Sequence, residues 1–143
     1  MNSTQSITLE QQICFRMYLA VRKIVFAYNT RLAKEDLTYT QYLVMLVLWE
    51  QQKMDMKELG KRLMLDSRTL TPLLNRLVEK GLLTKERGEK DKRRLIVSLT
   101  EAGALLRAKI TPIPKEIYDQ VSLDPDEASA LTRILDKIII AMK

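Results

Sequence analysis

The sequence predicts a mainly helical (α+β) fold with about six helices and one two-stranded β-hairpin. Apolar residues recur at helical spacing through most of the chain, and several of these segments begin with residues typical of a helix N-terminus. Between residues 82 and 99 the apolar spacing changes to the alternation expected of strands. A chain of 143 residues, with 46% hydrophobic and 29% charged residues, fits a single folded domain over residues 1–143.

The segment from Leu65 to Gly81 predicts one helix followed by a stop signal, Lys80-Gly81. Its candidate N-caps are Asp66, Ser67 and Thr69, and the leucines expected to face a core are Leu70, Leu73, Leu74 and Leu77. The other face carries donors and acceptors that suit base edges and phosphates: Ser67, Arg68, Thr69, Thr71, Asn75 and Arg76. Pro72 requires the helix to start nearby or to bend. An ordinary solvated helix face is the alternative.

Positive charge is concentrated around this polar helix. From Lys57 to Arg94 there are 12 Lys or Arg and 6 Asp or Glu, a net charge of +6, which equals the formal net charge of the whole chain. A localised excess of this kind indicates a polyanionic partner, most often nucleic acid. Charge that serves solubility alone is the alternative.

Three helices are expected before the polar helix. Thr8–Gln11 and Thr38–Gln41 have the form of capping boxes, which predict helices to about residues 34 and 51, and Asp55 begins a short helix to about residue 64. The short helix and the polar helix are joined by a tight turn at Leu65-Asp66. Together they predict a helix-turn-helix, whose second helix enters the major groove of DNA.

Residues 82–86 and 94–99 predict two strands, joined by a charged loop at residues 87–93. A hairpin with a basic tip beside a helix-turn-helix is a wing, so the predicted fold is a winged helix-turn-helix. An arginine at such a tip suits the narrow, electronegative minor groove. Lys92, Arg93 and Arg94 are therefore candidate DNA contacts, and a solvated turn is the alternative.

Both ends of the chain predict a dimer interface. The first helix is apolar around much of its circumference, which indicates burial on more than one side. A helix beginning at Thr100-Glu101 should be kinked or interrupted by Pro112 and Pro114, and a final apolar helix begins at Asp124. We expect residues 38–100 to form a DNA-binding lobe, and residues 8–35 and 101–143 to form a dimerisation lobe.

Composition excludes several classes of protein. The chain has no histidine, which removes the commonest general base and metal ligand, so we expect neither an enzyme, nor a metal site, nor a cofactor. The single cysteine rules out an internal disulfide framework and indicates a reducing, cytoplasmic setting. Residues 1–6 lack the form of a signal peptide, and the longest apolar run, from Tyr42 to Trp49, is too short to cross a bilayer, so no membrane partner is expected.

This order of elements resembles the MarR family (multiple antibiotic resistance regulators) of dimeric winged-helix repressors. Finer motifs are similar to the organic hydroperoxide resistance regulator branch of that family. They are Gln12-Ile-Cys-Phe15, Leu37-Thr-Tyr-Thr-Gln-Tyr42, Leu48-Trp-Glu50, Leu65-Asp-Ser67, Thr69-Leu-Thr-Pro-Leu-Leu74 and Ser98-Leu-Thr-Glu101.

The resemblance implies roles for particular residues. The redox-sensing cysteine would be Cys14, with Tyr28 and Tyr39 as its hydrogen-bonding partners and Tyr18 as a further aromatic residue. The recognition-helix residues would be Ser67, Thr69, Thr71 and Arg76, and Arg93 would be the arginine that enters the minor groove. Two departures are visible. Arg68 stands where the family usually has glycine, which could alter the target, and the resolving cysteine of two-cysteine members is absent.

Helix geometry indicates where such a sensor would form. Tyr28 follows Cys14 by 14 residues, so the two lie within about 40° of the same helix face but about 21 Å apart along the axis. They cannot touch within one helix, whereas they can if the first helices of two subunits pack antiparallel. A sensor site built from both residues therefore requires a homodimer.

The expected chemistry is oxidation of the Cys14 thiolate, favoured by the nearby helix N-terminus and the tyrosine hydroxyls, to a sulfenic acid by an organic hydroperoxide. A small cellular thiol would then cap the sulfenic acid, or it would be overoxidised, and the change would release an inverted-repeat operator. A buried, inert cysteine is the alternative for Cys14. For the chain, the alternatives are a regulator that answers a small phenolic ligand or another oxidant and, remotely, a thiol peroxidase.

Overall fold

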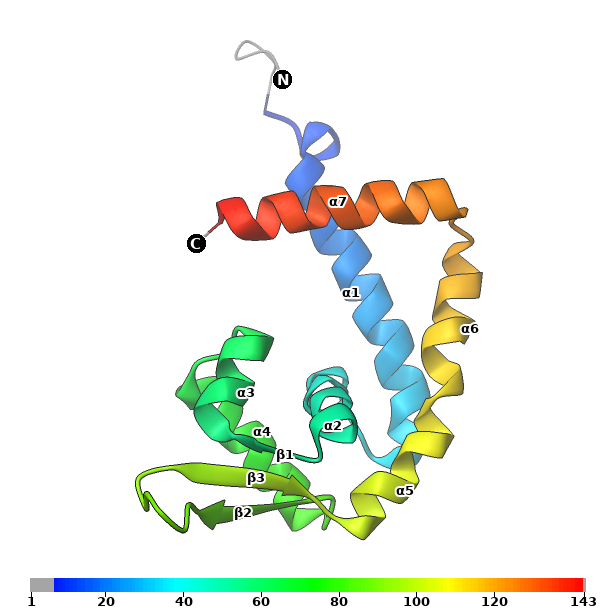
Figure 1. Ribbon diagram of the computed structural model, residues 1–143. Helices are drawn as coiled ribbons and strands as arrows, with labels where there is room; N and C mark the ends of the chain where they lie inside the picture. The colour runs from blue at the N-terminus through cyan, green and yellow to red at the C-terminus, as the bar shows by residue number, and fades with distance from the viewer. Residues whose placement is uncertain (1–6, 143) are drawn as a thin grey trace. The chain divides into compact units, whose positions relative to one another are not determined.

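A computed structural model describes residues 7–142 and divides the chain into two compact units, with the boundary between Thr111 and Pro112. The expectation that residues 1–6 do not begin a signal peptide falls outside the described residues. The first unit contains α1 (Ile13–Leu32), α2 (Tyr39–Gln51), β1 (Lys53–Asp55), α3 (Met56–Leu63), α4 (Ser67–Glu79), β2 (Leu83–Arg87), β3 (Leu95–Leu99) and α5 (Glu101–Ile110) (Figure 1). The second contains α6 (Pro112–Val121) and α7 (Pro125–Ala141).

The helix α2 is the centre of the first unit. Seven of its residues are buried, including Val44, Met45 and Leu48, which are fully inaccessible to solvent. The predicted capping box begins this helix, because Thr38 accepts from the Gln41 N–H while the Gln41 side chain accepts from the Thr38 N–H. Near its end the buried Trp49 indole donates to the Gly103 carbonyl at 2.8 Å, which fastens α2 to α5.

The helix-turn-helix consists of α3 and α4. Asp55 and Asp66 cap the two helices by accepting from the N–H groups of Lys57 and Thr69. Met64 ends α3 in the left-handed conformation, with φ 56°, so the chain can turn directly into α4. Gly60 is required beside this turn, since a Cβ there would lie only 2.9 Å from the Leu65 carbonyl oxygen. The predicted tight turn before the polar helix is therefore confirmed.

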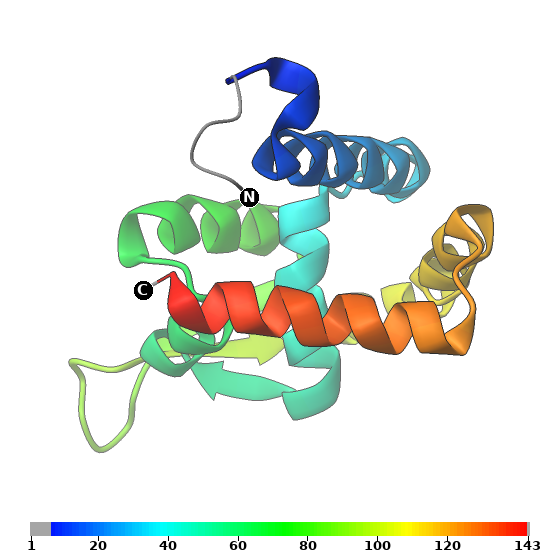
Figure 2. The same ribbon diagram turned by 90° about the horizontal axis from the view of Figure 1, so that it is seen from above.

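The wing is a three-stranded antiparallel sheet with the order β1-β3-β2, rather than the expected two-stranded hairpin. The strand that sequence reasoning missed is β1, in which Met54 pairs with Val97 of β3. It has only three residues and depends on a partner far away in the sequence, so local alternation could not reveal it. Figure 2 shows that the loop joining β2 and β3 extends well beyond the ends of both strands.

Of two predicted helix boundaries, one was wrong and one is confirmed. Thr8 makes no side-chain capping bond, residues Leu9–Gln11 form a 3₁₀ turn, and α1 begins only at Ile13. The predicted interruption at Pro112 and Pro114 is confirmed: α5 ends at Ile110, and the two prolines lie in the first turn of a separate helix, α6. Proline fits there because first-turn N–H groups need no intrahelical partner.

In the second unit, Asp124 and Glu127 form the capping box of α7, and Pro125 is the first helical residue, as the start signal predicted. Its apolar residues Leu131, Ile134, Leu135 and Ile139 are each 40–51% exposed. None of the described helices combines the length and apolarity needed to cross a membrane.

Candidate DNA interface and redox site

The outer face of α4 is the centre of the candidate DNA interface. Leu70, Leu74 and Leu77 are buried, with at most 1% exposure, so the opposite face of the helix is directed outward. The residues predicted to contact DNA lie on that face: Ser67, Arg68, Thr69, Asn75 and Arg76 are exposed, and Thr71 is half-buried. These side chains present hydroxyl, amide and guanidinium groups, the chemistry that reads base edges in a major groove.

Asn75 is also tied to the wing. Its Oδ1 accepts from Lys85 Nζ of β2 at 2.6 Å, so the amide NH₂ group is the part of the side chain left to donate. The bond joins the middle of α4 to the neighbouring strand. It therefore orients Asn75 before any ligand is present.

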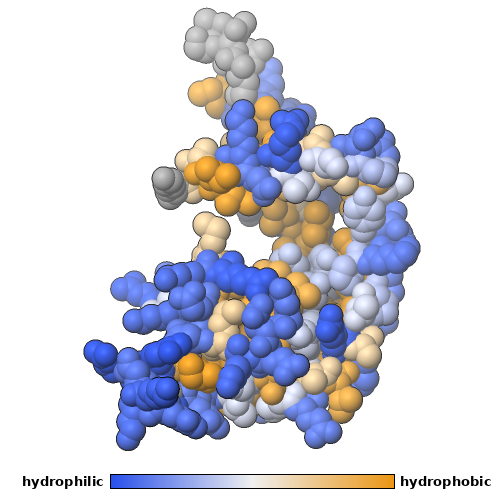
Figure 3. All heavy atoms as spheres, viewed as in Figure 1, coloured by the Kyte–Doolittle hydropathy of each residue, from blue (hydrophilic) through white to orange (hydrophobic). Residues whose placement is uncertain are grey.

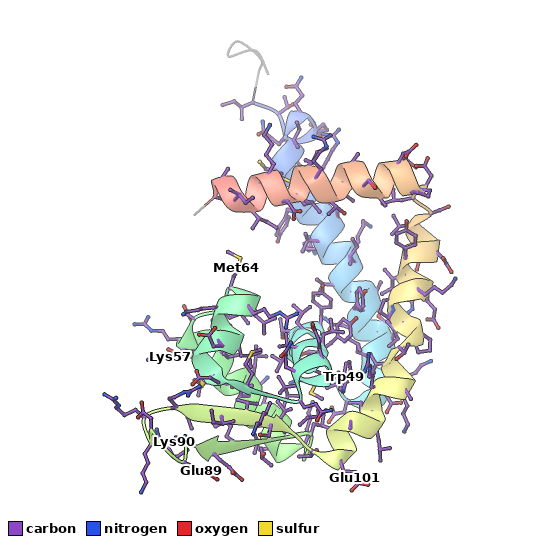
Figure 4. All side chains as sticks on the ribbon, viewed as in Figure 1. Trp49, Lys57, Met64, Glu89, Lys90 and Glu101 are labelled. Atoms are coloured by element: carbon purple, nitrogen blue, oxygen red, sulfur yellow. The ribbon has the colours of Figure 1, made fainter. Side chains whose placement is uncertain are left out.

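Asp91 shapes the tip of the wing. Its Oδ1 accepts from the backbone N–H of Arg93 at 3.0 Å and from Arg93 Nε at 3.1 Å, and its Oδ2 accepts from Arg93 Nη2 at 3.3 Å. The Arg93 side chain donates the hydrogen bonds that hold the pKa of Asp91 below its usual value. Arg93 is 92% exposed, so it is held in place yet fully available at the tip. In Figure 4 the neighbouring Glu89 and Lys90 project outward from the same loop.

Arg94, expected to contact DNA, has a structural partner. Its Nε donates to Asp55 Oδ2 at 2.7 Å, and the same carboxylate caps α3 through Oδ1. The Asp55 side chain is only 9% exposed. This hydrogen bond is the largest cause that lowers the pKa of Asp55, and it raises the pKa of Arg94. Arg94 therefore fastens the base of the wing to the start of the helix-turn-helix.

A groove of about 950 Å³ lies between α3, the turn into α4 and the wing. Its floor includes Leu65, Leu70 and Leu95, and its rim carries Lys57 and Lys61 beside Arg93. Sequence reasoning did not select the two lysines, although both lie in the segment that holds the whole net charge. Figure 3 shows a largely hydrophilic surface over this part of the molecule, and Figure 4 shows Lys57 on the side of α3 that faces the wing. The groove places cations between α4 and the wing, the two elements predicted to contact DNA, and a phosphate backbone is the polyanion that such cations suit.

Three tyrosines meet where α1 ends and α2 begins. The ring of Tyr28 lies 4.9 Å from that of Tyr39 and 5.4 Å from that of Tyr42, centroid to centroid. Burial raises the pKa of Tyr28, and burial together with the neighbouring tyrosines raises the pKa of Tyr42 to about 12. The structure therefore brings together two of the predicted sensor residues and adds Tyr42, whose apolar surroundings in the sequence had marked it only as core.

Cys14 does not join this tyrosine cluster within one chain. It is exposed and is the second residue of α1, near the end of the helix opposite Tyr28. With about 1.5 Å of rise per residue, 14 residues separate the two by about 21 Å. Tyr18 is 62% exposed, and the Arg22 guanidinium lies 5.5 Å from the centre of its ring.

Large apolar side chains around Cys14 are open to solvent. Ile13 is 57% exposed, Tyr18 is 62% exposed and Val21 is 59% exposed, and at about 100° per residue Tyr18 and Val21 lie within about 40° of Cys14 on the helix. Isolated apolar residues on a surface are ordinary, but a row of them along one helix marks an interaction surface. Cys14 therefore lies within a surface suited to packing against another chain.

Comparisons with known proteins agree with these features. Residues 27–110 match the family model described as transcriptional regulator SarA/Rot. The chain is 44% identical to an organic hydroperoxide resistance transcriptional regulator of Bacillus subtilis, over 81% of this chain and 79% of the relative. It is 38% identical to the HTH-type transcriptional regulator SarZ of Staphylococcus saprophyticus, over 92% of this chain and 90% of the relative.

Solved structures are similar over almost the whole chain. Reduced AbfR bound to DNA matches with a TM-score of 0.80 and 33% identity, covering 94% of each chain. Overoxidised AbfR bound to DNA matches with a TM-score of 0.78, also at 33% identity, covering 94% of this chain and 95% of the AbfR chain. AbfR is a protein of Staphylococcus epidermidis.

Proposed function

Because the chain belongs to the SarA/Rot family of MarR-like winged-helix transcriptional regulators, we propose that it is a repressor in which Cys14 senses organic hydroperoxides. The predicted resemblance to the organic hydroperoxide resistance branch is confirmed by the relative in Bacillus subtilis. The observation that carries the sensor assignment is the placement of an exposed Cys14 at one end of α1 and the Tyr28–Tyr39 pair at the other.

The DNA-binding step uses α4 and the wing. The exposed polar face of α4 enters the major groove, Arg93 enters the adjacent minor groove, and Lys57 and Lys61 contact the backbone between them. Reduced AbfR, with 33% identity, was captured bound to DNA, which supports this role for the same fold. Two copies related by a two-fold axis would read an inverted repeat, with half-sites one helical turn apart.

The sensing step uses two chains. Antiparallel packing of two α1 helices would cover the apolar side chains around Cys14 and bring that thiol to the partner's tyrosine cluster. Hydrogen bonds from tyrosine hydroxyls would hold the reduced thiolate in place. The proposed active species is therefore a homodimer with two sensor sites, each built across the interface.

Oxidation of Cys14 proceeds in two steps. The Cys14 thiolate attacks the distal oxygen of a hydroperoxide, the O–O bond breaks, and the alkoxide takes a proton to leave as an alcohol, while the sulfur becomes a sulfenic acid. A small cellular thiol then displaces water from the sulfenic acid and leaves a mixed disulfide. Overoxidised AbfR was captured bound to DNA, so we favour the bulkier mixed disulfide as the species that releases the operator.

Two other functions make different predictions. A regulator that answers a phenolic ligand or another oxidant would keep its response without Cys14, whereas a thiol peroxidase would consume peroxide continuously when a thiol is supplied. The relatives are transcriptional regulators, which favours regulation over catalysis. A repressor of this kind works where its operator is, in the cytoplasm.

The deciding experiment is operator binding by the wild type and by Cys14→Ser, each with and without an organic hydroperoxide plus a small thiol. We expect the wild type to release DNA and Cys14→Ser to hold it, with equal affinity in the reduced state. Tyr118→Phe, a conservative change at a residue outside the proposed sensor, controls for non-specific effects of substitution and should respond like the wild type. Equal release by the wild type and Cys14→Ser would refute the sensor role.

A further inference from the structure

A lysine at the end of the recognition helix is bonded to the segment that carries the sensor tyrosines. Lys80 follows α4 as its C-cap, and its side chain is only 25% exposed. Its Nζ donates to Gln41 Oε1 at 3.0 Å and to the Asp36 carbonyl, and it lies 3.7 Å from Asp36 Oδ2. Both acceptors of this ammonium, and the carboxylate that pairs with it, belong to the α1–α2 connector, which we define as residues 33–41.

The connector is built as a stiff piece. Asp36 is held in the left-handed conformation, with φ 55°, and the Leu37 N–H donates to the Leu32 carbonyl at 3.1 Å. Leu37 is 3% exposed and Gln41 is 2% exposed, so both ends of the connecting turn are anchored in the core. The Gln41 oxygen that accepts from Lys80 also accepts from the Thr38 N–H at 3.2 Å. A displacement of one part of the connector is therefore carried to the rest.

The other side of the connector contacts the sensor cluster. Tyr39 lies two residues before Gln41, and its N–H donates to Asn29 Oδ1 at 2.7 Å. Asn29 follows Tyr28 in α1, and the Tyr28 and Tyr39 rings are 4.9 Å apart. Tyr39 and Gln41 therefore connect α1 and α4 through a single turn of α2.

We propose that Lys80 is a positioning residue that transmits a rearrangement of the tyrosine cluster to the recognition helix. This inference rests on the proposed sensing function. When modification of Cys14 displaces Tyr28 and Tyr39, the start of α2 moves and the acceptors of Lys80 move with it. The leucines beneath α4 make non-directional contacts and allow it to slide, whereas the Lys80 hydrogen bonds are directional.

The geometry amplifies the movement. The helix α4 has 13 residues, so Ser67 lies about 20 Å from Lys80 along the axis. A small rotation at Lys80 therefore produces a larger displacement of the end that reads DNA. Because a dimer must place two such helices in successive grooves, a modest change in each is sufficient for release.

The test compares operator affinity before and after oxidation for Lys80→Met, which keeps the apolar stem and removes the three donors. We expect oxidation to weaken wild-type binding by about 5- to 150-fold, the usual range for coupled sites. In Lys80→Met, reduced binding should stay within about threefold of the wild type, while the effect of oxidation should fall several-fold. Lys80→Arg should restore part of the response.

The matched control is Lys109→Met. Lys109 Nζ lies 3.7 Å from Glu35 Oε2, so this lysine also contacts the connector, but it does so from α5 and not from the recognition helix. The Lys109→Met substitution removes the same positive charge as Lys80→Met, and it should leave the loss of operator affinity on oxidation unchanged. If the wild type and Lys109→Met lose DNA on oxidation and Lys80→Met loses it to the same extent, the inference is overturned while the sensing function stands. If the wild type itself holds DNA after oxidation, both are overturned.

A measurement on the wild type keeps the inference testable if Lys80→Met folds poorly. Hydrogen exchange of the amides at the end of α4, from Arg76 to Lys80, reports on the last turn of the helix. We expect oxidation of the wild type to change their exchange rates in the free protein, together with those of Tyr39 to Gln41. Unchanged rates at the end of α4, in protein that has lost its operator, would overturn the role of Lys80.

Discussion

The DNA-binding surface and the proposed sensor differ in how much of each a single chain supplies. The DNA-binding surface is finished within one chain: its helices are capped, its leucines are buried, and Asp91 and Asp55 hold the arginines of the wing. The sensor is divided, with Cys14 and the tyrosine cluster at opposite ends of α1. On the proposed function, one chain supplies a complete DNA-contacting surface, whereas the sensor needs two chains to be complete.

The largest expected effect comes from mixing defective subunits. In a heterodimer, one subunit carries Cys14→Ser and the other carries Tyr28→Phe with Tyr39→Phe, which keep the rings but remove the hydroxyls. If the sensor is built across the interface, this heterodimer keeps one intact site. That site combines the unsubstituted Cys14 of one subunit with the unsubstituted tyrosines of the Cys14→Ser subunit. Such a heterodimer should lose operator affinity on oxidation by several-fold, up to the loss measured for the wild type, and a loss of about tenfold corresponds to about 1.4 kcal/mol.

Both parent homodimers are the controls, and neither should respond to peroxide. A sensor contained within each chain would be broken in both subunits, so a heterodimer that ignores peroxide would contradict the division of the sensor between chains. Gel-shift titrations on differently tagged, purified heterodimers would measure the outcome.

A smaller effect tests whether the wing is held from within its own chain. Loss of the Arg94–Asp55 bond, in Arg94→Met or Asp55→Asn, should cost about 0.5–1.5 kcal/mol of operator binding, which is about 2- to 12-fold. If Arg94 acts only by holding Asp55, the dependence of affinity on salt should stay the same for both variants. Arg68→Gly, at an exposed position on α4, should instead reduce the salt slope by about 1.

The double variant provides the internal check on that bond. Arg94→Met combined with Asp55→Asn should cost little more than either change alone, because both remove one shared interaction. A reduced salt slope for Arg94→Met, with unchanged affinity for Asp55→Asn, would instead support the sequence prediction that Arg94 contacts DNA directly.

The smallest expected effect is a change with pH in the stability that Asp55 contributes to the folded protein. The hydrogen bond from Arg94 lowers the pKa of Asp55 in the folded state below its ordinary 3.8. A lowered folded-state pKa stabilises the protein above the ordinary value, and this stabilisation is lost as the pH falls through the folded-state pKa. The difference in unfolding free energy between the wild type and Asp55→Asn should therefore be constant near neutrality and shrink below pH 3.8. A difference that grows on acidification would contradict the pairing.

Local sequence signals succeeded where they coincided with burial. The capping-box pattern occurs at both Thr38 and Thr8, yet it caps a helix only at Thr38. At Thr38 the preceding Leu37 is 3% exposed, so packing fixes the entry of the chain, whereas the residue preceding Thr8, Ile7, is 91% exposed. The hydrogen bonds of a cap are too weak to begin a helix without that support.

The candidate site was predictable in its residue types but not in its pairing. The polar face of α4 and the basic tip of the wing both follow from the spacing of residues in the sequence. The structure places both where they were expected. The Arg94–Asp55 bond joins residues 39 positions apart through β1, a strand whose only signal is its partner. The contacts of Tyr42 could not be predicted for a similar reason. The apolar run from Tyr42 to Trp49 gives no local signal that the Tyr42 ring packs against two other tyrosines.

The short outer strands of the wing have a consequence for solubility. A winged-helix regulator must expose its wing to contact DNA, and an exposed sheet edge is a template on which other chains can add strands and aggregate. Here β3 is enclosed on both sides, β1 has three residues and runs directly into α3, and β2 carries Lys85, Glu86 and Arg87. The shortness of β1 and the charges on β2 discourage strand addition by another copy of the chain. The wing can therefore be exposed to DNA without promoting aggregation.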